Sequence, residues 1–490
     1  MPSQTTSPRA GGSASLFDPV APQRQPLWTS AFGAVVAFLI LAGGLSAHGF
    51  LGDVGWDVAD GVWILHHGFV PLHNYLSQAM YGAAWTNAEW LFGLYVGWLY
   101  QLLGRLGVYL GLLPVLAATA WLLALSSRRL GPYWELIWPA AAATTLLPVM
   151  SPRPQLFSYV LFAFALYALA RWRAGDRLLI WLCAATSVLW TNSHGSAVLL
   201  PLALLLELLF ADATGRRQLL WPLLLAVVLL AVHPGGLSGT LANLGHVGSS
   251  SNVTVIAEWA SPDFHTPAFW LPLAALLAGF ALLLPAMWRR RRYADAVLLV
   301  GASIAMLYAV RFLPYLMLVL ALRGAEYVPP RLMLLSAPGA VRRSQLLGAV
   351  AVIALCAVLA PRQLFPARYP VKAFSWLRSH HVRNVFNSYA IGSTLEAVGL
   401  RPYLDGRDNL WLQRRWWPQY VAVSSGGESV LTYLRRFDPH ARYVLWFARS
   451  PVALTLDASA HWRRVLVDPN RTNPQAATTG AYVIWQRVGP

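Results

Sequence analysis

Long apolar runs alternate with short polar segments over the first 361 residues of the chain. Runs of about 17 to 20 residues recur, and a helix of that length crosses a hydrocarbon core about 30 Å thick. The pattern predicts an α-helical polytopic membrane protein with about eleven transmembrane helices. The spans are expected at residues 29–50, 107–126, 134–150, 155–171, 178–191, 196–210, 218–232, 268–287, 294–310, 312–322 and 346–361.

Five basic clusters fall on one side of the membrane if the N-terminus is cytoplasmic. Cytoplasmic loops carry an excess of Lys and Arg, so this agreement favours eleven spans with the N-terminus inside and the C-terminus outside. Residues 90–104 are apolar but short and rich in Trp and Tyr, and we interpret them as an amphipathic or re-entrant helix at the interface. The clusters are Arg128 and Arg129; Arg171, Arg173 and Arg177; Arg216 and Arg217; residues 289–292; and Arg342 and Arg343.

The first outer loop, residues 51–105, is polar where its neighbours are apolar. It carries Asp53, Asp57, Asp60 and Glu89 in a chain in which only 12% of residues are charged. Ionisable groups at the edge of a membrane are costly, so each is a candidate functional residue. We expect this loop to form the floor of an active site on the outer face.

The last part of the chain, residues 362–490, has a mixed pattern. Five short segments read as strands and two as helices, which predicts a small extracytoplasmic α/β domain with a partly parallel sheet. Residues 1–28 are polar and rich in small residues, and are expected to be a disordered cytoplasmic segment. The predicted domains are therefore 1–28, a transmembrane domain at 29–361, and 362–490.

Composition excludes several classes of protein. The 490 residues are 57% hydrophobic, and a soluble chain of this length would be far more charged. The net charge of +17 lies mainly in the clusters between spans, which indicates membrane topology rather than nucleic-acid binding. Cys183 and Cys356 both fall within apolar runs, so no disulfide framework is expected. A Walker sequence and a nucleophile elbow are both absent from the sequence, which argues against an ATP-driven pump.

The polar islands predicted to face outwards supply the candidate chemistry. Carboxylates can act as a general base, and arginines can hold a phosphate through forked hydrogen bonds. Arg311 is a stronger candidate than Arg153 for binding phosphate, because it stands between two apolar runs. An interfacial arginine that extends its head group to water would show the same pattern. His194 fits either a ligand role or a polar helix cap, and Trp85 either a sugar platform or the interfacial aromatic belt. No spacing matches a metal motif, and a divalent metal stays open as a cofactor.

Several motifs resemble the GT-C superfamily of membrane glycosyltransferases, closest to an uncharacterised bacterial branch. A long acidic loop follows the first span, with HGFVP at 67–71 and the Glu89–Trp90 pair opening an apolar helix. The other matching segments are SPRPQLFSY (151–159), WTNSHG (190–195), AEW (257–259), FNSYAIG (386–392) and YLDGRD (403–408).

The resemblance implies an inverting transferase in a bacterial plasma membrane that uses a polyprenyl-phosphate sugar donor and contacts membrane lipid, with no nucleic-acid partner. Asp53 would be the leading acidic residue, Glu89 would lie near the acceptor, and Arg311 would bind the donor phosphate. Asp57 stands where such loops are expected to carry a His, and an adjacent Asp–Glu pair is absent, so the identity of the base stays open. The complete candidate set is Asp53, Asp57 and Glu89 as catalytic residues, Arg311 and Arg153 at the donor phosphate, and His194, Asn192, Glu258, His233 and Trp85 in the substrate pocket.

Two other classes use the same features. A transporter or flippase of a lipid-linked glycan would use the polar islands as a pathway, but such proteins place polar groups at mid-membrane in broken helices, whereas here they gather at one face. A non-catalytic scaffold would use the C-terminal domain to recruit envelope proteins. Loss of function in Asp53→Asn with normal folding would argue against the scaffold.

Overall fold

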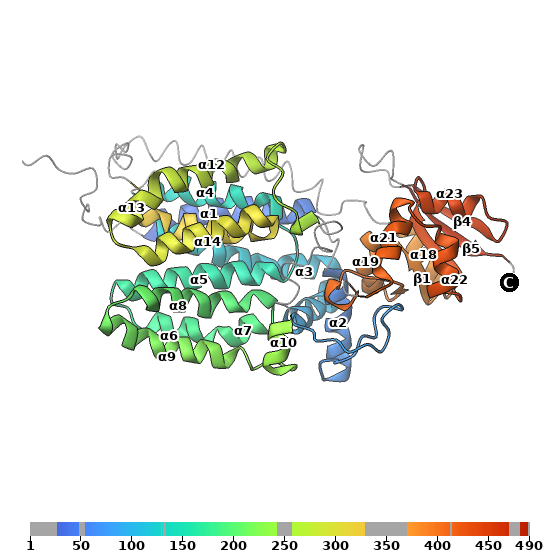
Figure 1. The fold of residues 1–490 in the computed structure, drawn as a ribbon, viewed down its shortest axis with the longest axis horizontal. Coiled ribbons are helices and arrows are strands. Elements are labelled where there is room, and N and C mark those ends of the chain that lie inside the picture. Colours follow the sequence, from blue (N-terminus) through green and yellow to red (C-terminus); the bar gives the residue numbers. More distant parts are fainter. Residues whose placement is uncertain are drawn as a thin grey trace, which may run out of the picture.

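The structure is a computed structural model that describes residues 27–48, 54–128, 130, 134–242, 257–328, 370–411, 414–469 and 481–488. Long helices lie side by side in one part of the molecule, and the C-terminal domain extends from one end of them (Figure 1). The helices of the first part are α1 (Leu27–His48), α2 (Val54–His67), α3 (Trp90–Ser127), α4 (Trp134–Leu146), α5 (Gln155–Arg173), α6 (Leu178–Ala185), α7 (Ser187–Thr191), α8 (Leu199–Phe210), α9 (Ala213–Leu229), α10 (Gly236–Ala242), α12 (Trp270–Ala278), α13 (Leu284–Arg289), α14 (Tyr293–Tyr308) and α15 (Leu313–Leu322).

Within the described ranges, three helical segments are long and apolar enough to cross a membrane: Trp90–Ser127, Gln155–Arg173 and Pro267–Arg289. Shorter apolar helices occupy four more of the expected spans. The eleventh expected span, residues 346–361, lies outside the described residues. The helical membrane class is therefore supported, and the count of eleven stays a prediction.

Helix α3 is bent back on itself. Leu103 and Gly104 leave the helical conformation, and Gly104 has a φ of 60°, which glycine adopts without a Cβ clash. The Tyr95 hydroxyl donates to the Gly111 carbonyl at 2.6 Å, so the two arms run antiparallel. Residues 90–102 are thus a short helix distinct from the second expected span, as the sequence pattern indicated.

Glycines set the contact between α2 and α3. A Cβ at Gly61 would lie 1.8 Å from the Gly93 carbonyl oxygen, and one at Gly97 would lie 2.6 Å from the Gly61 carbonyl carbon. Only glycine allows backbones to approach this closely. The acidic helix α2 is therefore held tightly against the first arm of α3.

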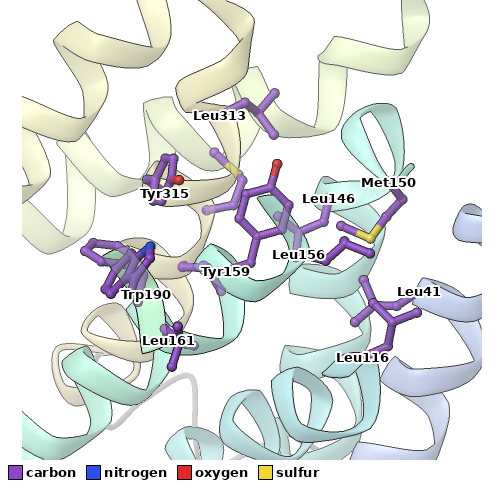
Figure 2. Close-up of a cluster of buried hydrophobic side chains, with 14 of the residues drawn as sticks. Leu41, Leu116, Leu146, Met150, Leu156, Tyr159, Leu161, Trp190, Leu313 and Tyr315 are labelled. Carbon is purple, nitrogen blue, oxygen red and sulfur yellow. The ribbon is translucent and has the colours of Figure 1, made fainter. Parts of the chain in front are cut away.

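The core of the helical part is apolar and continuous, with aromatic side chains from α5 and α15 at its centre (Figure 2). Tyr159 and Tyr315 pack edge to face with their ring centroids 5.9 Å apart. The other labelled members of this cluster are Leu41, Leu116, Leu146, Met150, Leu156, Leu161, Trp190 and Leu313.

A buried ion-pair cluster ties α5, α8 and α14 together. Arg173 donates to Glu207 at 2.6 Å and to Asp295 at 2.7 Å, and Arg323 also binds Asp295 at 2.7 Å. The sequence suggested that Arg173 is only one of the topology-setting charges, and that interpretation is incomplete. Removing one partner of such a buried pair costs about 3–5 kcal/mol because it leaves an uncompensated charge.

The C-terminal domain contains the five expected strands: β1 (Asn384–Asn387), β2 (Arg401–Pro402), β3 (Tyr443–Phe447), β4 (Trp462–Pro469) and β5 (Ala481–Arg487). Their order in the sheet is β2-β1-β3-β5-β4. β1 pairs in parallel with β2 and β3, whereas β5 pairs antiparallel with β3 and β4, so the sheet is partly parallel as expected. The helices are α18 (Val371–Ser379), α19 (Gly392–Ala397), α20 (Asp408–Trp411), α21 (Trp417–Ser425), α22 (Val430–Phe437) and α23 (Pro451–Asp457).

The first loop contributes to the core of this domain. Trp56, Met80 and Trp85 are buried in the same cluster as Phe386 and Tyr420 of the C-terminal domain. Helix α2 also touches α19 so closely that a Cβ at Gly55 would lie 2.1 Å from the Ser393 carbonyl oxygen. The loop and the domain therefore pack as one unit, which the sequence pattern did not reveal.

Candidate active site

His194 stands at the start of a short helical turn, Gly195–Val198, and is buried. Its Nδ1 lies 2.9 Å from the Ser158 hydroxyl and 2.8 Å from the Ser196 hydroxyl, and it accepts from the Ser196 N–H at 3.3 Å. Because Nδ1 is an acceptor, the ring proton belongs on Nε2, which lies 3.7 Å from Oε1 of Glu89. Burial, with the positive charge of Arg311, lowers the pKa of His194 to about 3. The ring is thus neutral and directs an N–H towards the Glu89 carboxylate.

Glu89 precedes α3 and is fixed by its neighbours. Its backbone N–H donates to Oδ1 of Asn87 at 2.8 Å. The next residue, Trp90, donates through its indole to Oδ1 of Asn192 at 2.6 Å, and Leu91 donates its N–H to the Asn192 carbonyl at 3.0 Å. Asn192 also donates to two backbone carbonyls, so its side chain fastens the start of α3 to the turn that carries His194.

Asp60 on α2 is a carboxylate of the first loop that other loop residues hold by hydrogen bonds. It accepts from the Tyr75 hydroxyl at 2.9 Å and from the Asn87 amide at 2.6 Å. Burial raises its pKa to about 7, although both hydrogen bonds and the charge of Arg407 oppose the rise. Asn87 also offers its carbonyl to Nε2 of His233 at 3.1 Å. The sequence marked Asp60 as one of several outer carboxylates, but it gave no sign that Asn87 would join Asp60 to Glu89.

The two candidate phosphate-binding arginines are covered by consecutive residues of one turn, Ala257–Trp259. Arg153 forms an ion pair with Glu258, and the guanidinium of Arg311 lies 4.0 Å from the ring centre of Trp259. The Val310 N–H also donates to the Ala260 carbonyl at 3.0 Å. The structure thus brings Arg153, Arg311 and Glu258 to one place, as the polar islands suggested.

Tyrosines connect these arginines to the histidine. The charges of Arg153 and Arg311 both act on Tyr159, whose ring packs against Tyr315. The Tyr315 hydroxyl donates to the Ser196 hydroxyl at 2.9 Å, and Ser196 contacts His194. Contacts thus lead from Tyr315 through Ser196 to His194 and Glu89, and the charge of Arg311 acts on His194.

Three further candidates, Asp53, Asp57 and Trp85, are not among the contacts around Glu89 and His194 given above. Asp53 is outside the described residues. Asp57 is fully buried on α2. Trp85 packs against Trp56, with ring centroids 6.0 Å apart, and is buried in the cluster that contains residues of the C-terminal domain.

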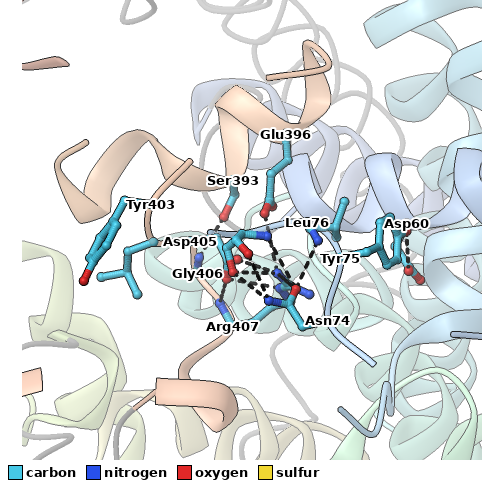
Figure 3. A network of polar contacts seen from close by, with 12 residues as sticks. Asp60, Asn74, Tyr75, Leu76, Ser393, Glu396, Tyr403, Asp405, Gly406 and Arg407 are labelled. Carbon is cyan, nitrogen blue, oxygen red and sulfur yellow. Dashed lines mark hydrogen bonds and ion pairs between the residues drawn. The ribbon is translucent and has the colours of Figure 1, made fainter. Parts of the chain in front are cut away.

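A second polar network joins the first loop to the C-terminal domain (Figure 3). Arg407, which is buried, forms an ion pair with Asp405 and donates to Asn74 at 2.7 Å. Burial acts to raise the pKa of Asp405, but Arg407 outweighs it and holds that pKa below its usual range. Burial, with the nearby Asp405 charge, raises the pKa of Glu396 well above its usual range. The sequence favoured a salt-bridged turn around Asp405 and Arg407, and the structure extends it to a contact between distant segments.

The fold of this chain is similar to the folds of solved structures of other proteins. No family model matches the chain, and no curated protein matches it. The archaeal oligosaccharyltransferase AglB from Archaeoglobus fulgidus, solved with an inhibitory peptide and a dolichol-phosphate, is 13% identical with a TM-score of 0.57, over 85% of this chain and 69% of AglB. ArnT from Cupriavidus metallidurans in its apo state is 14% identical with a TM-score of 0.55, over 95% of this chain and 99% of ArnT. The chain has a GT-C fold.

The GT-C fold confirms the resemblance suggested by the acidic first loop. The apolar helices of the described ranges agree with the helical membrane class expected from the sequence. Within the described ranges, no three His, Cys, Asp or Glu side chains are placed to hold one metal ion.

Proposed function

We propose that this GT-C protein is a glycosyltransferase that moves a sugar from a polyprenyl-phosphate donor to an acceptor on the outer face of the membrane. One observation carries the proposal: Glu89, a carboxylate of the acidic first loop, lies beside His194, which feels the charge of Arg311, and one turn holds Arg311 and Arg153 together. A transferase needs both a base and a cationic site for the leaving phosphate. The similarity of the fold to AglB and ArnT agrees with this chemistry.

The reaction would be a direct displacement with inversion. An acceptor hydroxyl attacks the anomeric carbon, a carboxylate takes the hydroxyl proton, and the bond from the anomeric carbon to the phosphate oxygen breaks. The polyprenyl phosphate leaves with the electron pair of that bond. Glu89 is our candidate base, because the neutral His194 beside it neither carries a positive charge nor competes for the proton. Asp53 and Asp57 remain alternative bases.

Arg311 and Arg153 would stabilise the charge that develops on the leaving phosphate. Arg153 is paired with Glu258 and Arg311 with Trp259, so the donor phosphate would replace both contacts when it binds. The turn Ala257–Trp259 would then shift away from the arginines. His194, Asn192, Glu258 and His233 would shape the substrate pocket, and Asn192 and His233 would fix the backbone around Glu89.

The membrane arrangement belongs to the same proposal. Eleven spans would place the N-terminus in the cytoplasm and residues 51–105 and 362–490 outside a bacterial plasma membrane. A lipid-linked donor explains why the polar cluster lies at one end of the long helices, where the lipid head group would enter.

The test is transfer by purified protein in lipid nanodiscs, with a panel of polyprenyl-phosphate sugars and a mixture of acceptors. Arg311→Ala should lower the rate about 10²- to 10³-fold, the loss typical of removing one preorganised donor to a developing charge. Arg292→Ala is the matched control, because it removes an exposed arginine beside α14 that is outside the cluster.

Glu89→Gln distinguishes loss of the catalytic base from loss of donor binding. It keeps the size of the side chain and should abolish transfer while leaving donor binding intact. If Glu89→Gln and Arg311→Ala both transfer as fast as wild type, the assigned site is wrong. If wild type transfers none of the sugars, the proposed function is wrong for these donors.

A further inference from the structure

An open cleft of about 910 Å³ lies between the first loop and the C-terminal domain. Its walls come from one face of α2, the start of β2 and the region between α18 and β1. The elements that form these walls meet at the junction between the long helices and the C-terminal domain (Figure 1). Ligand sites commonly enclose about 300–1,000 Å³, so this cleft has room for more than one sugar ring.

The lining of the cleft is basic. Only one carboxylate, Glu396, faces it among the described residues, and that side chain is buried against Arg407. Within the described part of the chain, none of the basic side chains lining the cleft forms an ion pair with an Asp or Glu. These side chains are His66, His67, Arg378, His381, Arg383 and Arg401.

Several of these side chains are held in place by the fold. Arg378 donates through Nε to the Val398 carbonyl at 2.8 Å, which fixes its guanidinium at the rim. The guanidinium of Arg401 lies 4.6 Å from the ring centre of Tyr81, and the Arg401 N–H donates to the carbonyl of Arg383, just before β1, at 2.9 Å. Like charges repel, and their concentration without carboxylate partners creates a field that attracts an anion.

Aromatic rings line the same cleft. Trp63 stacks on His67 with ring centroids 3.9 Å apart and lies 4.7 Å from the ring of Tyr75, and Tyr100 lies on the wall formed by α3. Aromatic faces next to hydrogen-bonding groups suit sugar rings, which have apolar C–H faces and a polar edge. A simple phosphate ion would use the arginines but not these rings.

The cleft is connected to the proposed catalytic cluster. Tyr75 lines the cleft and donates its hydroxyl to Asp60 at 2.9 Å (Figure 3). Asp60 in turn binds Asn87, which holds the Glu89 backbone. A molecule in the cleft would therefore lie one side chain away from the network that positions the candidate base.

We infer that this cleft binds an anionic saccharide, one that carries carboxylates or phosphates, as the acceptor of the proposed transfer. The assignment of this ligand as acceptor rests on the proposed function, whereas its binding does not. The arginines would hold the anionic groups through charge-assisted hydrogen bonds, and Tyr100 would contact the rings.

The test measures binding without transfer, by calorimetry on the full chain in nanodiscs of neutral phosphatidylcholine. The probes are trigalacturonate, glucose 6-phosphate, neutral maltotriose and inorganic phosphate. At least one of the two anionic sugars should bind about tenfold or more tightly than maltotriose and inorganic phosphate. Arg383→Gln/Arg401→Gln should weaken that binding at least tenfold, because it removes two charged donors. Arg435→Gln/Arg436→Gln on α22 loses the same charge outside the cleft and should bind like wild type.

Three results would overturn the inference. Neither anionic sugar binds; maltotriose or inorganic phosphate binds as tightly as they do; or both double variants lose binding equally. A fourth arm uses nanodiscs of phosphatidylglycerol, and loss of sugar binding only there would show that the cleft takes a lipid head group instead. Binding without any transfer from polyprenyl donors would leave the cleft assignment standing and refute only the proposed function.

Discussion

Arg407 provides a sharp test of how the first loop and the C-terminal domain are joined. It is buried, forms an ion pair with Asp405, donates to Asn74 at 2.7 Å and lies 4.5 Å from the ring centre of Trp85. Arg407→Met keeps much of the side-chain length but removes the charge. It would leave Asp405 buried without its cation.

The expected cost follows from that buried carboxylate. Breaking a buried ion pair by removing one partner costs about 3–5 kcal/mol, and protonation of Asp405 would recover part of this. We therefore expect a loss of about 3 kcal/mol in the free energy that holds the loop on the domain. Since about 1.4 kcal/mol equals a factor of ten, the open population should rise about 10²-fold.

Two backbone amides report this opening directly. The Gln78 N–H donates to the Pro402 carbonyl at 2.9 Å, and the Ala79 N–H donates to the Tyr403 carbonyl at 3.0 Å. Hydrogen exchange at these two amides should accelerate about 10²-fold in Arg407→Met, while amides inside α5 keep the wild-type rate.

Two further variants sharpen the comparison. Arg407→Met/Asp405→Asn should regain part of the protection, because the unpaired carboxylate is also gone. Arg401→Met is the matched control, since that arginine stacks on the exposed Tyr81 at 4.6 Å rather than forming the buried pair. An acceleration below about threefold in Arg407→Met, or an equal one in Arg401→Met, would refute the reasoning.

Three other predictions concern the loop and the site. Gly55→Ala should lower the unfolding midpoint and speed proteolytic cleavage of the first loop, because its Cβ would lie 2.1 Å from the Ser393 carbonyl oxygen and push α2 away from α19. A wild-type midpoint and cleavage rate would contradict that packing. The folded state keeps the pKa of His194 near 3, well below its usual value of 6.5. Between these two pH values only the unfolded state binds the proton, so the free energy of unfolding should fall as the pH falls from 6.5 to about 3. The slope from this one group is at most about 1.4 kcal/mol per pH unit. Unfolding midpoints from pH 7 to 4 should show a shallower slope in His194→Asn, and an unchanged slope would count against the buried neutral ring. Asn87→Ala should destabilise the protein by about 1–3 kcal/mol and lower the rate of sugar transfer, because it leaves Asp60 with one fewer hydrogen bond. A denaturation midpoint and a transfer rate equal to those of wild type would show that Asn87 is not part of the network.

Features set by local pattern could be predicted from the sequence. Short segments of apolar, β-branched and aromatic residues identified all five strands, because such segments are buried in a sheet whichever strand lies beside them. The apolar runs predicted the helices around α5 and α14 for the same reason. The short helix before Gly104 was also predicted, since its length was insufficient for a span.

Features that depend on contacts between distant segments could not be predicted. Arg407 and Asn74 are 333 positions apart, and the local pattern around Arg407 shows only a turn. Arg173 resembled a topology-setting charge because its partners, Glu207 and Asp295, lie on other helices. Glu89 and His194 were both selected for their place in outer loops, but Asn87, which connects Glu89 to Asp60, has no chemical signature of its own.

The central claim is that the protein breaks the bond between a sugar and a polyprenyl phosphate. The most direct measurement is the release of free polyprenyl phosphate from a radiolabelled donor by the purified full chain in proteoliposomes, together with the amount of glycosylated acceptor. The account predicts that the two products appear in equal amounts and that both disappear in Glu89→Gln. Movement of intact donor between the two leaflets without release of polyprenyl phosphate would contradict it and identify a transporter of the lipid-linked sugar.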